Sequence, residues 1–81
     1  MKKVYVNVDY QILVGGAIRP ISIYWHDGRS WEIIKTLHSS GSSDDYEGIR
    51  YTVLIGSVER YLYRIEDKWY VESIQTEVDI G

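Results

Sequence analysis

Apolar and polar residues alternate along most of this chain, and a period of two is typical of β-strands that bury one face. The alternation is clearest between Lys3 and Ile12, where every second residue is Val, Tyr or Ile. The residues on that side are Val4, Val6, Val8, Tyr10 and Ile12. Gly15 and Gly16 follow, and they predict a turn because glycine adopts positive φ without steric penalty. The sequence therefore predicts an N-terminal strand that leads into a hairpin.

Further segments show the same alternation, and no stretch has the spacing of an amphipathic helix. These segments are 18–25, 31–37, 49–56, 58–66 and 68–74. Connections of two or three residues separate the last three, and loops so short join only antiparallel neighbours. Closure into a barrel removes the open edges that a flat sheet would leave. We expect an all-β fold, a small antiparallel β-barrel of five to six strands in a hairpin meander, SH3-like or OB-like, with residues 1–81 as its single domain.

Three local features qualify this pattern. Within segment 31–37, "IIKTL" breaks the alternation, which predicts a bulge or burial on both sides. Pro20 predicts either an edge or the entry to the second strand, because proline donates no ladder hydrogen bond. The polar stretch from His38 to Gly48 predicts a loop. Segment 58–66 alternates regularly, and there we expect Tyr61 and Tyr63 on one face and Leu62 on the other.

The composition favours a small intracellular protein. With 81 residues and 44% hydrophobic residues, the chain has room for one efficiently used core. Its aromatic residues are three Trp and eight Tyr with no Phe, and such rings favour half-buried positions and binding faces. The chain has no Cys, which excludes disulfides and thiolate sites, and small secreted domains usually need disulfides. No segment approaches the ~20 apolar residues of a membrane span, so we expect a cytoplasmic protein.

The stretch "WHDGRSW", Trp25 to Trp31, places a histidine, an aspartate, an arginine and a serine together. A catalytic triad of His26, Asp27 and Ser30 is disfavoured, because neighbouring residues of a strand point to opposite faces. Asp-Gly between two apolar runs instead predicts a hairpin with a type I′ turn.

Other chemistry finds little support in the sequence. The two histidines, His26 and His38, have no recognisable metal-ligand spacing, and "SSDDYEG" lacks the ligand pattern of a calcium loop. "GGAIRP" leads into a strand and therefore offers no helix N-terminus to a phosphate. We expect no catalytic residue, no metal and no cofactor, and hence no enzyme.

Arginines beside exposed aromatic residues suggest a binding surface. Small barrels hold single-stranded nucleic acid by stacking bases on aromatic rings while arginines follow the phosphates. Strand parity places Tyr24, Arg50, Arg60, Arg64 and Tyr70 on the outward side. The net charge of -3 argues against binding by bulk phosphate attraction. The candidate partner-binding residues are Arg19, Tyr24, Arg29, Arg50, Arg60 and Arg64.

Three motifs carry a family resemblance: "IRPISIYWHDGRSWEI", "GIRYTVLI" and "YLYRIEDKWYVE". The matching positions are Ile18, Pro20, Ile23, Trp25, Asp27, Gly28, Arg29, Trp31 and Ile33; then Gly48, Ile49, Arg50, Tyr51, Thr52 and Ile55; then Tyr61, Leu62, Trp69, Tyr70, Val71 and Glu72. The chain resembles, from Ile18 to Ser73, a family of small bacterial proteins of unknown function common in Firmicutes. That family is loosely similar to a C-terminal domain of bacterial relatives of Y-family translesion polymerases.

The resemblance implies a setting in DNA damage tolerance and no catalytic residue. Relatives often carry a basic segment before the G-I-R-Y motif, whereas here it is acidic, so contact with DNA through this loop is less expected. Two hypotheses follow for a non-enzymatic interaction module. One is binding of single-stranded nucleic acid; the other is protein binding or self-association, including a homodimer, through an exposed strand or aromatic patch that docks a repair or replication protein. Arg29 and Arg50 are expected either to touch the partner or to form ion pairs with Glu32, Glu59 or Glu72.

Overall fold

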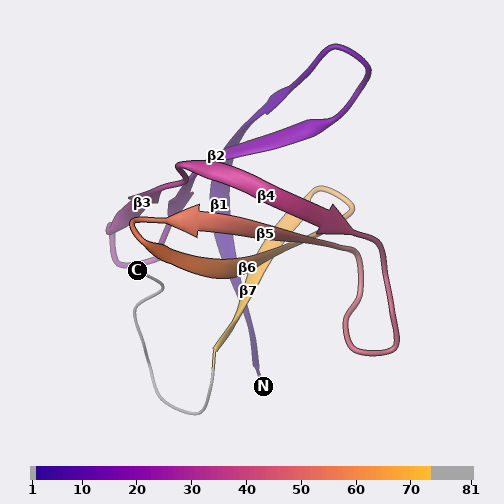
Figure 1. The fold of residues 1–81 in the computed structure, drawn as a ribbon. Helices are drawn as coiled ribbons and strands as arrows, with labels where there is room; N and C mark the ends of the chain where they lie inside the picture. Colours follow the sequence, from indigo (N-terminus) through magenta and orange to yellow (C-terminus); the bar gives the residue numbers. More distant parts are fainter. Residues whose placement is uncertain (1, 74–81) are drawn as a thin grey trace.

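The computed structural model describes residues 2–73, which form seven strands and no helix (Figure 1). The strands are β1 (Lys2–Ile12), β2 (Ile18–Tyr24), β3 (Ser30–Glu32), β4 (Lys35–Ser40), β5 (Ile49–Ile55), β6 (Val58–Ile65) and β7 (Lys68–Ser73). All paired strands are antiparallel, which confirms the predicted all-β class. Within residues 2–73 no helix is long and apolar enough to cross a membrane. Ile74, predicted to end the last strand, lies outside the described residues.

The strands form one curled sheet in the order β3-β2-β1-β7-β6-β5-β4. Its two edge strands, β3 and β4, are consecutive in the chain, and only Ile33 and Ile34 separate them. The Ile33 N–H donates to the carbonyl of Ile21 in β2, and the Ile34 N–H donates to that of Leu54 in β5, both at 2.8 Å. Figure 1 shows β4, β5 and β6 crossing in front of β1. The sheet therefore curls into a half-barrel whose opposite edges meet at this short connection.

The broken alternation in "IIKTL" marks this corner at its start, and the predicted bulge lies at its end, where the register between β4 and β5 shifts between Thr36 and His38. Ile33 bonds to β2 and Ile34 bonds to β5, so the chain passes from one edge of the sheet to the other between these two residues. One predicted strand thus becomes two, β3 and β4, and the barrel has seven strands where five to six were expected.

The core lies inside the curl of the sheet. Its fully enclosed members include Val53 and Leu62, both 0% exposed. The buried cluster consists of Ile23, Trp25, Ile33, Tyr51, Val53, Ile55, Leu62, Trp69 and Val71. Burial of one such aliphatic or aromatic side chain contributes roughly 1.5–3 kcal/mol, so this cluster is the main source of stability.

The Trp25 to Arg29 segment is a hairpin, as predicted, but the turn is not type I′. The Trp25 carbonyl accepts from the Gly28 N–H at 3.0 Å, and the Trp25 N–H donates to the Arg29 carbonyl at 2.8 Å. Gly28 has a φ of 95°, whereas Asp27 is not among the described residues with positive φ, and a type I′ turn requires positive φ at both. The loop is therefore a three-residue one, in which a turn is followed by a left-handed glycine.

The hairpin between β1 and β2 projects beyond the rest of the sheet (Figure 1). The apolar face of β1 packs against the core as far as Val8, while Tyr10 and Ile12 are exposed. The register between β1 and β2 shifts after Asp9, and Pro20 pairs with Tyr10 inside β2. β3 pairs with β2 only from Ser22 to Tyr24, so Pro20 lies at an edge, the first of its two predicted positions. The period-two pattern thus continues into a hairpin that has left the core.

Gly48 fixes the end of the loop between β4 and β5. β4 continues to Ser40, so the loop is shorter than the predicted stretch from His38 to Gly48. Gly48 has a φ of 81°, and a Cβ there would overlap the Arg64 carbonyl oxygen. Its N–H donates to Ser42 Oγ at 2.8 Å, and the Tyr70 hydroxyl donates to the Glu47 carbonyl at 3.0 Å. These contacts attach the loop to β6 and β7.

Candidate functional site

Five tyrosines form a cluster on the side of the sheet opposite to the core, which we call the tyrosine face. Its members are Tyr5, Tyr46, Tyr61, Tyr63 and Tyr70. Tyr63 and Tyr70 are buried at its centre, whereas Tyr5 and Tyr61 are about half exposed. The sequence analysis placed Tyr63 with the core, but Leu62 points into the core and Tyr63 therefore points away from it.

Hydrogen bonds within the chain already occupy the buried hydroxyls of this face. The Tyr63 hydroxyl donates to Glu72 Oε1 at 2.8 Å. Burial, and then the Glu72 carboxylate, raise the pKa of Tyr63 to about 12. Burial also raises the pKa of Tyr70. Lys3 Nζ lies 2.5 Å from Glu47 Oε1, and its hydrogen bond and charge lower the pKa of Glu47. The centre of the tyrosine face is therefore a structural network.

Arg50 is the one predicted binding arginine that lies on the tyrosine face. Its guanidinium carbon lies 4.6 Å from the centre of the Tyr46 ring and 4.3 Å from that of Tyr61. These distances are those of cation–π contacts, which hold the guanidinium between two rings. Arg50 therefore has a packing role, and its predicted ion pair with Glu32, Glu59 or Glu72 is not found among the described salt bridges.

Arg60 and Arg64 lie on the other side of the sheet from Arg50, which contradicts their predicted outward position. Both flank the buried Leu62 on the same face of β6, and both are half-buried. The Arg64 guanidinium carbon lies 6.0 Å from the Trp69 ring centre. The sequence predicted that the tyrosines of β6 face the core. The core instead takes the opposite face of β6, with Leu62 at its middle and Arg60 and Arg64 on either side of it.

The remaining predicted residues lie on hairpins. Arg19 is on the projecting hairpin, where its Nη1 donates to Gln11 Oε1 at 3.3 Å. Tyr24 is partly exposed, as predicted, and donates to Asp9 Oδ2 at 2.7 Å, a bond that raises the pKa of Tyr24.

Arg29 has a local explanation. Its Nε donates to Asp27 Oδ2 at 2.7 Å, and its backbone N–H donates to Asp27 Oδ1 at 3.0 Å. These bonds, the backbone one first, lower the pKa of Asp27. Arg29 thus forms an ion pair with the turn aspartate, and its guanidinium carbon lies 5.4 Å from the centre of the Trp31 ring. The six candidates do not converge on one surface.

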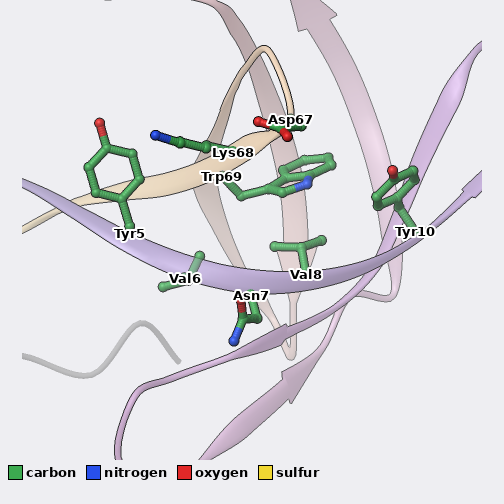
Figure 2. A pocket seen from close by; sticks show the side chains of 8 residues that line it. All are labelled: Tyr5, Val6, Asn7, Val8, Tyr10, Asp67, Lys68 and Trp69. Carbon is green, nitrogen blue, oxygen red and sulfur yellow. The ribbon is translucent and has the colours of Figure 1, made fainter.

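A groove beside β1 is the site that sequence reasoning missed. β7 pairs with β1 only as far as the pair Val6 and Trp69, whereas β1 continues to Ile12. The two strands diverge there, and a groove of about 490 Å³ lies between them. Figure 2 shows Trp69 above Val8, with Tyr10 beside it. The lining residues are Tyr5, Val6, Asn7, Val8, Tyr10, Asp67, Lys68 and Trp69.

The backbone of β1 presents hydrogen-bonding groups to this groove. The Trp25 N–H donates to the Arg29 carbonyl and therefore points away from β1. Because backbone groups alternate in direction along a strand, those of Tyr24 point towards β1 and form hydrogen bonds with its partner Asn7. The N–H and C=O groups of Val8, Tyr10 and Ile12 therefore point away from β2. Among residues 2–73, no strand pairs with β1 on that side beyond Val6. The groove is an open sheet edge whose lining mixes apolar residues such as Val8 with polar ones such as Asn7 and Lys68.

The last feature of the site is its set of possible metal ligands. No group of three or more His, Cys, Asp or Glu side chains among those residues is close enough to hold a metal ion.

Comparisons of this chain with protein-family models, with curated proteins and with solved structures find no match. The resemblance to the Firmicutes family stays a prediction.

Proposed function

We propose that this protein is a non-enzymatic binding module that takes up an extended strand of a protein partner along the open edge of β1. The observation that carries the proposal is that β1 extends beyond its pairing with β7 beside a groove, with the backbone groups of Val8 and Tyr10 facing the gap. Strand addition supplies main-chain hydrogen bonds for affinity, and side-chain pockets for specificity.

The surroundings of the groove suit such a ligand. Val8 and Tyr10, whose ring centre lies 5.6 Å from that of the buried Trp69, offer apolar contact on one side of an added strand. Lys68 and Asp67 add polar groups to the lining. An exposed hydrophobic edge without a cover is an aggregation hazard, so a natural partner would also protect this chain. The absence of cysteine supports a cytoplasmic setting. The polymerase-like resemblance would make a repair or replication protein the partner.

Binding of single-stranded nucleic acid has weaker support. Of the six predicted candidates, only Arg50 lies on the tyrosine face, and two rings enclose its guanidinium. Arg60 and Arg64 lie on the other side of the sheet. A surface that binds phosphates needs its cations in one groove together with accessible aromatic rings. The dispersed arginines therefore favour a protein partner.

A pair of substitutions at one position tests the proposal. Tyr10→Pro removes an N–H that faces the groove and makes no bond to β2, and Tyr10→Thr removes the same ring but keeps the N–H. Random twelve-residue peptides displayed on phage would be selected on the wild-type chain, and binders measured by titration with NMR detection. We expect the selected peptides to shift the amide resonances of Val8, Tyr10 and Ile12.

The two variants should separate backbone pairing from side-chain contact. Loss of one intermolecular hydrogen bond weakens binding by roughly threefold to tenfold, so Tyr10→Pro should bind that much less tightly than Tyr10→Thr. Equal affinity of both folded variants, or failure of any peptide to shift the three amides, would contradict strand addition.

A further inference from the structure

We infer that the strand on the open edge of β1 is β1 of a second copy of this chain; this inference rests on the proposed function and names its partner. The two β1 strands would run antiparallel about a two-fold axis, with Tyr10 opposite Tyr10. Such an interface uses the same patch on both copies, so the patch must complement itself. Three features of the projecting hairpin meet that requirement.

The first feature is the spacing of the outward backbone groups. Val8, Tyr10 and Ile12 are symmetric about Tyr10, so each Val8 meets Ile12 of the second copy. All three residues then exchange hydrogen bonds across the axis.

Neighbouring registers are poorer. An axis at Asp9 would place two aspartates directly opposite each other, which is destabilising. An axis at Gln11 would place Val8 opposite Val14, and Val14 lies in the turn that Leu13 and Ala17 close with a 2.7 Å backbone bond. Only the register about Tyr10 satisfies the whole edge.

The second feature is charge complementarity. In the register about Tyr10, Asp9 of one copy lies opposite Gln11 of the other. Arg19 Nη1 donates to Gln11 Oε1, so the guanidinium extends over Gln11 towards the open edge. It would meet Asp9 of the second copy, and the two-fold axis makes this pair of opposite charges occur twice.

The third feature is the apolar tip of the hairpin. Ile12 and Val14 are 69% and 105% exposed, and no residue from Tyr10 to Ala17 is charged. Because Trp69 already occupies the place opposite Val6, the ladder between the two copies would end at Ile12, and Leu13 and Val14 would turn out over the groove beside Lys68 and Trp69. The tip of each copy would thus cover the groove of the other, and both apolar surfaces would be removed from water.

Cysteine cross-linking tests the register, since the natural chain has no cysteine. In Tyr10→Cys the two Cα atoms would lie about 5.5 Å apart, within the range of a disulfide. In Ile12→Cys they would lie about 13 Å apart, because Ile12 faces Val8. We expect disulfide-linked dimers of Tyr10→Cys on mild oxidation, and none of Ile12→Cys. Equal linking of Asp9→Cys or Ile12→Cys would overturn the register.

Sedimentation of the wild-type chain at increasing concentration tests the dimer itself, and charge reversal tests its interface. Arg19→Asp should raise the dimer Kd about tenfold, and Asp9→Arg with Arg19→Asp should restore it towards the wild-type value. A chain that stays monomeric, with no linked Tyr10→Cys dimer, overturns the inference. If the chain is monomeric but the selected peptides bind Tyr10→Pro more weakly than Tyr10→Thr, the proposed function stands without the dimer. If the peptides also bind both variants equally, the proposed function and the dimer are both overturned.

Discussion

The rings of Tyr63 and Tyr70 stack face to face on neighbouring strands, with centres 4.8 Å apart and planes 4° from parallel. Both rings are buried, and both lie on the side of the sheet that faces away from the core. This small protein therefore buries aromatic side chains on two faces of one sheet. The second cluster depends on hydroxyl groups, because Tyr63 and Tyr70 each donate a hydrogen bond.

The raised pKa of Tyr63, about 12, predicts a loss of stability in alkali. The folded chain holds this proton more tightly than the unfolded chain, whose tyrosine pKa is about 10. Its contribution is therefore complete below about pH 10 and declines between pH 10 and 12, by up to roughly 1.4 kcal/mol per pH unit. Urea unfolding of the wild type and of Tyr63→Phe measures this, and we expect a shallower decline in the variant. An identical pH dependence would show that Tyr63 is not the group responsible.

Two glycines with positive φ should differ in their tolerance of alanine. Gly48→Ala would place a Cβ against the Arg64 carbonyl in addition to the strain of its φ, so we expect a loss of about 2–4 kcal/mol. Gly28→Ala has open space around the Cβ and only the backbone strain, so we expect about 1–2 kcal/mol. Thermal and urea unfolding give both values. The order of the two variants is the decisive result, and a reversed order would contradict the close approach at Gly48.

Glu66 has a φ of 56°, the one positive φ at a non-glycine residue among those described. Glu66→Gly should relieve this strain at the β6–β7 turn and stabilise the fold by about 0.5–1 kcal/mol, after allowance for the greater freedom of glycine in the unfolded chain. Asp67→Gly, at the next position of the same turn, is the matched control and should not stabilise. A rise in unfolding midpoint for both variants would point to loop flexibility instead of φ.

The dispersed arginines predict that the chain does not bind single-stranded DNA. We expect no binding of an oligothymidine at ~50 mM salt, where phosphate contacts are strongest. Fluorescence anisotropy with a labelled oligonucleotide measures this. Binding that falls steeply with salt, and that weakens in Arg60→Ala or Arg64→Ala, would favour the nucleic-acid hypothesis over a protein partner.

Several features of the fold follow from the sequence because they depend on neighbours along the chain. The period of two predicted the strands, and short connections predicted antiparallel pairing. Strand parity predicts core positions for Trp25, Trp31 and Trp69; Trp25 and Trp69 are buried in the core, and Trp31 packs against it partly buried. Asp27 and Gly28 were expected in a turn and lie in one. The bond from the Trp25 N–H to the Arg29 carbonyl makes the loop three residues long instead of two. Local geometry is enough for these predictions.

The tertiary structure alone decided which face of each strand is inside and where a strand leaves the sheet. In β6, tyrosines and leucine alternate, and only packing against Val53 and Trp69 chooses Leu62 for the core. In β1 the pattern runs unbroken to Ile12, but β7 ends opposite Val6. The alternation of apolar and polar residues shows that the two faces of a strand differ. It does not show whether another strand pairs with each edge of that strand at a given residue. The open edge beside Tyr10 was therefore invisible in the sequence, since it depends on the lengths of strands far apart in the chain.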